Sequence, residues 1–280
     1  MFSLAEFLGR IRMPAVMGIV NATGDSFSEG TASAPETAAE RAFRLLDDGA
    51  DLLDLGGEST RPGAAPVTEE EELRRILPAL LEIKRRRPDA VCAIDTRHGK
   101  VAAAALEAGA EIINDVAMLH VAPEIADAVA RHGAGLILCH SRGTPENMNS
   151  PVCLNYPRGV AETVAEELAA AEKAAVAAGV KAADILLDPG FGFAKTPEQN
   201  WSLAGHLAAV APREKLLVGV SRKRFLGELT ANPAAADRDF ETLALELALA
   251  PRCAVIRTHN VKKLVRALAV AGRLDKAKTA

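Results

Sequence analysis

Many of the side chains that could do chemistry in this chain stand directly after short apolar runs. The stretch DLLDLGGESTRPGA, residues 51–64, is the clearest case, because an apolar run around Asp54 gives way to glycines, hydroxyls, Arg61 and a proline. Polar residues in comparable positions are Asn21, Asp95, Asn114, Asp115, His140, Asp188, Ser221, Arg257 and His259. Such residues also serve as helix N-caps. Arg257 and Lys223 cannot take that role, so a shared ligand site is the better interpretation of the set.

The polar residues fall into two chemical groups. Asp95, Asn114 and Asp188 offer carboxylate and amide groups, which pair with the donors and acceptors along the edge of a flat heterocycle. Positive charge suited to phosphate oxygens comes from Arg61, Lys223, Arg257 and His259. Neutral oxygens that could help to hold Mg²⁺ or a diphosphate belong to Asn21, Ser59 and Thr60. A polar heterocycle that carries a phosphorylated leaving group would satisfy both groups.

Missing motifs disfavour several enzyme classes. The chain contains no G-x-x-x-x-G-K-[ST], no H-E-x-x-H and no G-x-S-x-G, which argues against a nucleoside triphosphatase, a zinc peptidase and an α/β-hydrolase. The four cysteines have no C-x-x-C spacing, and three of them stand in apolar runs. We therefore expect buried thiols rather than a zinc site or a disulfide framework. These cysteines are Cys92, Cys139, Cys153 and Cys253.

Composition and charge are ordinary for a soluble globular protein. The chain is 49% hydrophobic and 25% charged, and its formal net charge is −4. Such a balance gives no field that would favour nucleic acid or an anionic membrane as a partner. The first residues, MFSLAEFLGRIRM, predict a short amphipathic helix rather than a signal peptide, and no apolar run approaches the length of a membrane span. We expect a reducing, cytoplasmic location.

A repeated pattern divides the chain into strand–helix units. At residues 47–55, 107–115 and 131–139 a helical pattern ends at glycine, and alanine leads into a short apolar run. The helix that follows the second strand has the clearest start, with Thr68 and Glu71 as a capping box. Strands are expected near 16–21, 51–55, 91–95, 111–115, 135–139, 184–188, 215–220 and 254–258.

Eight such units predict an α/β fold, a (β/α)8 TIM barrel in a single domain. A doubly wound open sheet is the alternative, but it would carry a G-x-G-x-x-G turn after the first strand, where this chain has GIVNATGD. In a barrel the carboxyl ends of all strands lie at one end, so the polar residues above would meet there. We expect an N-terminal extension at 1–12, the barrel at 13–274 and a flexible tail at 275–280.

Six motifs in this order resemble the dihydropteroate synthase family of pterin-binding barrels. The motifs are MGIVNATGDSFSEG (17–30), DLLDLGGESTRPGA (51–64), AIDTRHGKVAAAALEAGAEIINDV (93–116), ILLDPGFGFAKTPEQN (185–200), LLVGVSRKRFLG (216–227) and VIRTHNV (255–261). The resemblance implies a transferase of folate biosynthesis. Such an enzyme joins (7,8-dihydropterin-6-yl)methyl diphosphate to 4-aminobenzoate and releases diphosphate, with Mg²⁺ as cofactor and a homodimer as the usual assembly.

The resemblance also implies roles for individual residues of this chain. The pterin would be held by Asp95, Asn114, Asp188, Lys223 and Arg257. Diphosphate and aminobenzoate would be held by Asn21, Thr60, Arg61, Phe193, Ser221 and His259, and Asn21 would also bind the metal. The residues expected to be catalytic are Arg61, Lys223 and Arg257, and the loop at 56–64 would close over the substrate.

The chain departs from the family pattern at five positions. Gly24 stands where proline is usual, and Glu29 where aspartate is usual. Cys139, Ser141 and Arg224 replace methionine, a bulkier or amide residue, and serine. None of these changes removes a charged contact, so we expect them to alter affinity more than activity.

Two other functions remain open on the sequence. A pterin-dependent methyltransferase of the same barrel family would share the aspartates and asparagine but would need no diphosphate site. Arg61 and the SRK and RTH triplets at 221–223 and 257–259 favour a diphosphate site and so argue against this alternative. A paralogue that binds pterin without turnover is the second alternative. An assay of diphosphate release distinguishes all three.

Overall fold

Eight parallel strands form a nearly closed barrel in this computed structural model, which describes residues 2–22, 37–58, 66–232 and 234–278 (without the side chains of 275, 276 and 278). The sheet order is β6-β5-β4-β3-β2-β1-β8-β7, and a single parallel bridge between Leu187 and Leu216 joins its two edges. The strands are β1 (Ala15–Asn21), β2 (Leu52–Gly56), β3 (Val91–Asp95), β4 (Ile112–Asp115), β5 (Gly135–Cys139), β6 (Ile185–Asp188), β7 (Leu217–Val218) and β8 (Val255–Thr258). The predicted (β/α)8 barrel is confirmed.

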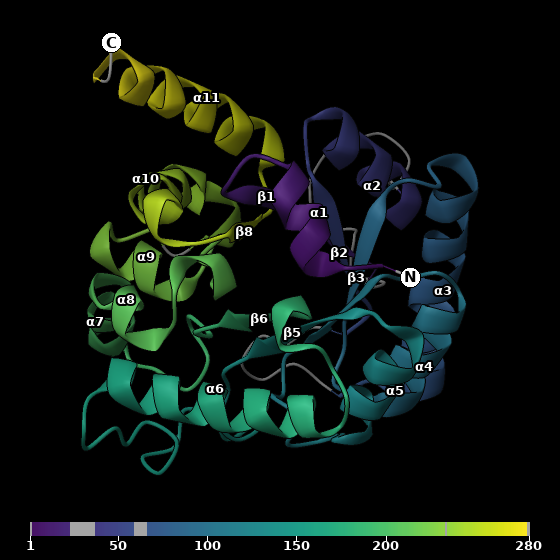
Figure 1. Cartoon of the computed structure of the whole chain (residues 1–280). Helices are drawn as coiled ribbons and strands as arrows, with labels where there is room; N and C mark the ends of the chain where they lie inside the picture. The colour runs from purple at the N-terminus through teal and green to yellow at the C-terminus, as the bar shows by residue number, and fades with distance from the viewer. Residues whose placement is uncertain (1, 23–36, 59–65, 233, 279–280) are drawn as a thin grey trace.

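Helices surround the barrel and follow the strands in turn (Figure 1). They are α1 (Leu4–Arg10), α2 (Ala38–Asp47), α3 (Glu69–Arg86), α4 (Gly99–Glu107), α5 (Glu124–His132), α6 (Val160–Ala177), α7 (Pro197–Gly205), α8 (Leu207–Val210), α9 (Arg224–Leu229), α10 (Asp239–Leu249) and α11 (Val261–Lys278). Gly133 closes α5 in the left-handed region at φ 61°, as the sequence pattern predicts. Among the described residues, we find no helix with the length and apolar character that a membrane span requires.

The capping box predicted at α3 forms only in part. The Thr68 side chain accepts a hydrogen bond from the backbone N–H of Glu71, at 3.3 Å. The Glu71 carboxylate does not complete the box, because it pairs with Arg74 at 2.8 Å and with Arg75 at 2.6 Å. Two arginines on the next turn offer charged donors, which outcompete a single backbone N–H for the same oxygens.

The strand register brings polar residues to one end of the barrel. Gly56 pairs with Asp95, Asp95 with Asn114, and Cys139 with Asp188. All of these pairs lie at the carboxyl ends of parallel strands, so their side chains belong to the same end. The apolar runs before them are fully buried, and they fill the barrel interior and the layer between strands and helices.

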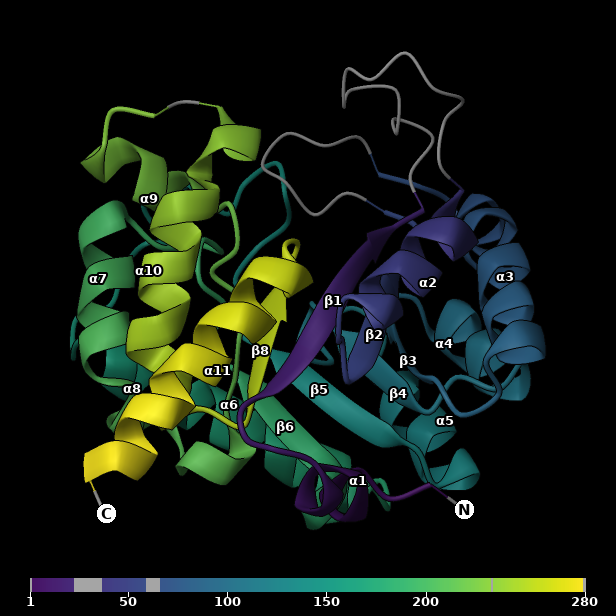
Figure 2. The ribbon, with the colours of Figure 1, turned by 90° about the horizontal axis from the view of Figure 1, so that it is seen from above.

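Helix α1 lies across the opposite, amino-terminal end of the strands (Figure 2). Leu4 and Leu8 are buried there against residues of the barrel interior such as Met17. Asp184 fixes the helix start, since its Oδ1 accepts from Ser3 Oγ at 2.9 Å and from Ala5 N at 3.1 Å. The division of the chain at residues 12 and 274 stays a prediction.

Candidate active site

Six polar side chains gather at the carboxyl ends of the strands and form what we call the polar cluster. Its members are Asp54, Asp95, Asn114, Asp188, Lys223 and Arg257. Five were predicted from the sequence as site residues, and the geometry brings them together. Asp54 was named from the sequence among the polar residues at strand ends but was given no ligand, because it stands inside the apolar run of β2.

Arg257 connects two carboxylates of the polar cluster. Its Nε donates to Asp54 Oδ2 at 2.5 Å, and its Nη2 donates to Asp95 Oδ2 at 2.8 Å. Asn114 Nδ2 donates to the same Asp54 oxygen at 3.2 Å. Asp54 is fully buried, whereas 20% of the Arg257 side chain is exposed. The arginine is therefore held by buried carboxylates and remains partly accessible to solvent.

Two buried oxygens of the polar cluster have no hydrogen-bond partner among the described residues. They are Asp54 Oδ1 and Asn114 Oδ1. A buried acceptor without a donor costs roughly 1–3 kcal/mol, so folded proteins rarely keep one without a reason. A ligand that carries N–H groups along one edge would supply the missing donors.

Burial and close charges shift the acid–base equilibria of the polar cluster. Burial, together with the charge of Asp54, raises the pKa of Asp95. Burial also raises the pKa of Asp188, although a hydrogen bond from Gly190 N to its Oδ1, at 2.8 Å, opposes the shift. Burial lowers the pKa of Lys223. Both carboxyls therefore hold a proton more readily than a carboxyl in water does.

Phe193 and Lys223 lie against each other beside the polar cluster. The Lys223 Nζ stands 4.1 Å from the centre of the Phe193 ring, within the range of a cation–π contact. Gly192 keeps the approach open, because a Cβ there would lie 3.0 Å from Lys223 Cδ. The pair combines a flat apolar surface with a cation, which suits an aromatic carboxylate.

Ser221 and His259 form a second pair, at the ends of β7 and β8. The Ser221 Oγ accepts from His259 N at 3.1 Å and lies 2.9 Å from His259 Nδ1, so the imidazole is held by its inner nitrogen. His259 also lines a cavity of about 130 Å³, and none of the polar-cluster residues lines it. The other charged residues of that cavity are Arg41, Arg44, Asp48 and Arg222. Positive charge therefore predominates around His259.

The remaining predicted residues are less well defined. Asn21 is exposed at the end of β1. Among the described residues no group of three or more His, Cys, Asp or Glu side chains is arranged to hold a metal ion. Five residues named from the sequence lie outside the described ranges, namely Gly24, Glu29, Ser59, Thr60 and Arg61.

The family departures in the described part do not disturb the polar cluster. Ser141 Oγ donates to the Val116 carbonyl at 2.8 Å, which ties the end of β5 to the end of β4. Arg224 pairs with Glu228 on its own helix at 2.9 Å, and 78% of its side chain is exposed. Cys139 is buried, and burial raises its pKa well above the ordinary value. All four cysteines are free, and Cys92, Cys139 and Cys253 are buried as predicted.

Comparison with known proteins places the chain among pterin enzymes. Residues 17–259 match the family described as pterin binding enzyme. The folic acid synthesis protein fol1 of Schizosaccharomyces pombe is 38% identical over 92% of this chain, which spans only 36% of that longer protein. Dihydropteroate synthase of Neisseria meningitidis serogroup C is 41% identical over 91% of this chain and 90% of its own length.

Solved structures agree with these relatives. Dihydropteroate synthase of Xanthomonas albilineans with 4-aminobenzoic acid has a TM-score of 0.83 and 38% identity, covering 94% of this chain and 93% of that chain. The same enzyme in complex with 7,8-dihydropteroate has a TM-score of 0.81 and 36% identity, covering 94% of each chain. Together with the polar cluster at the mouth of the barrel, these likenesses show that the chain belongs to the dihydropteroate synthase family of pterin binding enzymes.

Proposed function

We propose that the protein joins (7,8-dihydropterin-6-yl)methyl diphosphate to 4-aminobenzoate in folate biosynthesis, giving 7,8-dihydropteroate and diphosphate. The observation that carries the proposal is the pair of buried unpartnered acceptors, Asp54 Oδ1 and Asn114 Oδ1, beside Asp95 and Asp188. A pterin edge carries ring and amino N–H donors that would pair with them. The likeness to an enzyme solved with 7,8-dihydropteroate supports this ligand.

The proposed reaction breaks the bond between the pterin methylene carbon and the diphosphate oxygen. A bond from the aminobenzoate nitrogen to that carbon replaces it, and the nitrogen loses a proton. The electron-rich ring stabilises positive charge on the methylene carbon as diphosphate leaves. A neutral arylamine is already a nucleophile, so the site needs positive charge for the leaving group rather than a strong base.

We assign the residues of the site on this basis. Pterin is held by Asp95, Asn114, Asp188, Lys223 and Arg257, and Asp54 Oδ1 offers it a further acceptor. Diphosphate and aminobenzoate are held by Asn21, Thr60, Arg61, Phe193, Ser221 and His259. Arg61, Lys223 and Arg257 act catalytically by meeting charge on the leaving group. The exposed part of Arg257, the cation–π pair of Lys223 and Phe193, and the positive surroundings of His259 support these assignments.

Magnesium is proposed as the cofactor, bound by Asn21 and by the substrate's own phosphate oxygens. Mg²⁺ commonly takes one or two protein oxygens and completes its shell with phosphate and water, so a single exposed amide at the end of β1 fits this mode. When bound, the ion would neutralise charge on the departing diphosphate. Chelation should therefore lower turnover while leaving the affinity for a pterin without phosphate unchanged.

A homodimer and a cytoplasmic location complete the proposal. Four large apolar side chains of the last three helices are exposed, as an association surface requires, namely Leu229, Phe240, Val270 and Leu274. Four free thiols are in keeping with a reducing compartment.

Diphosphate release tests the proposed function against its two alternatives. The wild-type protein, given pterin diphosphate, 4-aminobenzoate and Mg²⁺, is expected to release diphosphate in equal amount to dihydropteroate. A pterin-dependent methyltransferase would bind the pterin but release none, and so would a paralogue that binds without turnover. Pterin binding without diphosphate release would overturn the proposal.

A further inference from the structure

A buried lysine outside the polar cluster holds the loop that carries Phe193. Lys195 is 6% exposed, and its Nζ donates to the carbonyl oxygens of Gly190 at 2.9 Å and Phe193 at 3.1 Å. The same Nζ lies 3.0 Å from His140 Nδ1 at the end of β5. An ammonium has three N–H donors, and these three acceptors use all of them.

His140 is prepared for this contact by its other nitrogen. Burial and the nearby Lys195 lower the pKa of His140 to about 4, so the imidazole is neutral near pH 7. Its Nε2 lies 2.9 Å from Glu167 Oε2. Burial acts to raise the pKa of Glu167, but hydrogen bonds from His140 and Arg142 outweigh it and lower that pKa to about 2. An ionised carboxylate only accepts, so we assign the imidazole proton to Nε2 and the acceptor role to Nδ1.

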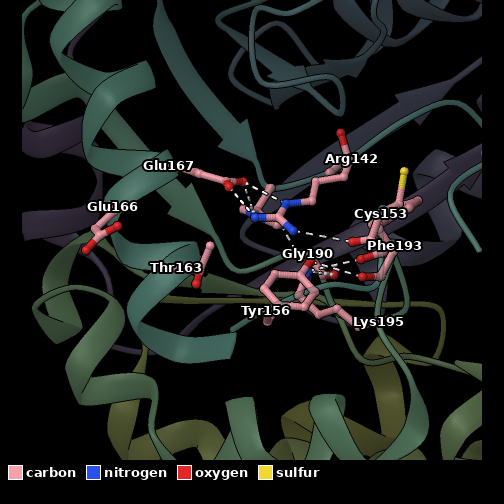
Figure 3. Close-up of polar contacts among 12 residues, drawn as sticks. Arg142, Cys153, Tyr156, Thr163, Glu166, Glu167, Gly190, Phe193 and Lys195 are labelled. Carbon is pink, nitrogen blue, oxygen red and sulfur yellow. Dashed lines mark hydrogen bonds and ion pairs between the residues drawn. The ribbon is translucent and has the colours of Figure 1, made fainter. Parts of the chain in front are cut away.

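The chain of contacts returns to the same loop by a second route (Figure 3). Arg142 also pairs with Glu167 of α6, and its guanidinium lies 4.2 Å from the centre of the Tyr156 ring. The Tyr156 hydroxyl donates to the Ala194 carbonyl at 3.0 Å. Gly190, Phe193 and Ala194 are therefore fixed from two sides by side chains that do not touch the polar cluster in any described contact.

The backbone of this loop has little freedom to settle elsewhere. Gly190 and Gly192 have φ of 69° and 77°, and Ala194 has φ of 48°, in the left-handed region that a residue with a Cβ seldom adopts. This backbone directs the side chains of Phe191 and Phe193 into different surroundings. Phe191 is buried and stacks on Phe225, with 6.3 Å between ring centres, whereas Phe193 meets Lys223. A shift of the carbonyls that Lys195 holds would move the Phe193 ring.

Stability alone does not explain why a lysine holds this loop, because burying its charge costs free energy. Its hydrogen bonds among the described residues go to neutral acceptors, and burial lowers its pKa to about 7. An apolar side chain of similar length would fill the space without the cost of burying a charge. We therefore look for the benefit of this network in the position that it gives to the loop.

We propose that Lys195 is a positioning residue for the aminobenzoate pocket, which sets the Phe193 ring against Lys223 through the carbonyls of Gly190 and Phe193. This inference rests on the proposed function, because that function assigns Phe193 to aminobenzoate. Lys195 itself would touch neither substrate. Its loss should weaken the binding of 4-aminobenzoate and leave the binding of the pterin unchanged.

The test compares Lys195→Met with Lys84→Met as a matched control. Lys84 is also largely buried, with 15% of its side chain exposed, and donates to a backbone carbonyl, that of Ala90 at 2.7 Å, but it lies at the amino-terminal end of the barrel. For Lys195→Met we expect KM for 4-aminobenzoate to rise about tenfold, because the Phe193 ring would lose its fixed position against Lys223. The calorimetric affinity for a pterin without phosphate should change less than twofold, and Lys84→Met should change neither quantity.

Tyr156→Phe keeps the test decisive if Lys195→Met does not fold. This variant removes only the hydroxyl that holds the Ala194 carbonyl, and KM for 4-aminobenzoate should rise about two- to fivefold with pterin affinity unchanged. The positioning role alone would be overturned if the wild type releases diphosphate and the variant that folds has an unchanged KM for 4-aminobenzoate. A wild type without diphosphate release would instead overturn the proposed function. Equal losses of pterin and aminobenzoate binding would indicate a merely structural lysine.

Discussion

At the scale of single residues, Arg257 carries one positive charge and has three carboxyl groups near it. Asp54 and Asp95 both bind it, and Asp188 also acts on it electrostatically. Lys223 offers the second cation of the polar cluster, and burial lowers its pKa. A ligand edge rich in N–H donors relieves this imbalance, whereas an anionic edge would increase it. The polar cluster is thus suited to a heterocycle at its base and to anions only near its outer part.

The first prediction concerns the base of the polar cluster. Asn114→Ala and Asp188→Ala should each weaken pterin binding by about 1–3 kcal/mol, or roughly five- to 150-fold, because a ring donor loses its buried acceptor. Calorimetry with a pterin analogue measures this. Asp115→Ala is the control: Asp115 is equally buried but accepts from the backbone of Ala117 and Leu119, so it should lower the melting temperature and not the affinity. Unchanged affinity in both test variants would contradict the assignment.

The second prediction uses the lowered pKa of Lys195. In the fold this lysine loses its proton near pH 7, while the unfolded chain keeps it up to about 10.5, so the unfolded state binds more protons in between. The free energy of unfolding of the wild type should therefore rise relative to Lys195→Met from pH 7 to 9, by up to about 1.4 kcal/mol per unit. Urea unfolding at pH 7, 8 and 9 gives the slopes. Parallel slopes would mean an ordinary lysine pKa in the fold.

The sequence predicts the residues at strand ends well, because parallel strands carry their carboxyl ends to one place whatever the helices do. It places Asp54 with these residues but assigns it no ligand, because its apolar neighbours make it part of the run of β2. It misses the pair of Lys195 and His140, which are 55 positions apart and belong to different loops. The partner of a buried lysine can be identified only from the folded structure, because nothing in the sequence relates the two positions. Thr60 and Arg61 stay predictions.

At the scale of elements, the loop between β6 and α7 depends on a close approach of two backbones. A Cβ on Gly190 would lie 1.8 Å from the carbonyl oxygen of His140. The same loop is held by Asn200 of α7, whose Oδ1 accepts from Gly192 N at 2.7 Å and whose Nδ2 donates to the Thr196 carbonyl at 2.8 Å. Strand, loop and helix are therefore held together by direct contacts.

The third prediction tests that approach with a pair of glycine substitutions. Gly190→Ala should lower the free energy of unfolding by at least about 2 kcal/mol, since the methyl group meets backbone and the φ of 69° is strained for alanine. Gly9→Ala, in α1 with nothing within 4 Å, should instead raise it by about 0.5–1 kcal/mol. Chemical unfolding of both variants checks the two signs. A mild effect at position 190 would show that the loop relaxes.

The positions of all eight strands follow from apolar runs and glycine punctuation, and the structure agrees within a few residues. The exception in length is β7, observed only at Leu217–Val218 where 215–220 was expected. Residues 213–215 form a 3-10 turn, and beyond Leu216 the strand pairs with β8 alone. Hydrophobic pattern marks where a strand lies, but its length depends on how well both neighbours match its register.

At the scale of the whole molecule, the last three helices leave large apolar side chains exposed, and the proposed dimer rests on them. Phe240 of α10 is 83% exposed, and Val270 of α11 is 72% exposed. Helices α10 and α11 pack against each other, so the two side chains belong to neighbouring elements. Large apolar side chains left in water on adjacent helices are typical of a surface that another chain covers.

The fourth prediction is that Phe240→Glu converts the protein from dimer to monomer at micromolar concentration, because a carboxylate in the interface would lose its water without gaining a partner. Light scattering coupled to gel filtration measures the mass. Leu81→Glu, at a position of α3 that is 54% exposed, serves as the control and should leave the mass unchanged. A wild type that is monomeric, or a dimeric Phe240→Glu protein, would remove α10 from the interface.

The anchoring of α1 on Asp184 has a consequence for the order in which the protein is made. Ser3 and Asp184 are 181 positions apart, so the helix leaves the ribosome long before its anchor does. At roughly 5–20 residues per second, the interval is about 10–35 s. Throughout that time the side of the helix with Leu4 and Leu8 has no barrel floor to cover it. The nascent chain thus exposes the apolar side chains of a short amphipathic segment to chaperones, and the floor of the barrel can close only after β6 has been translated.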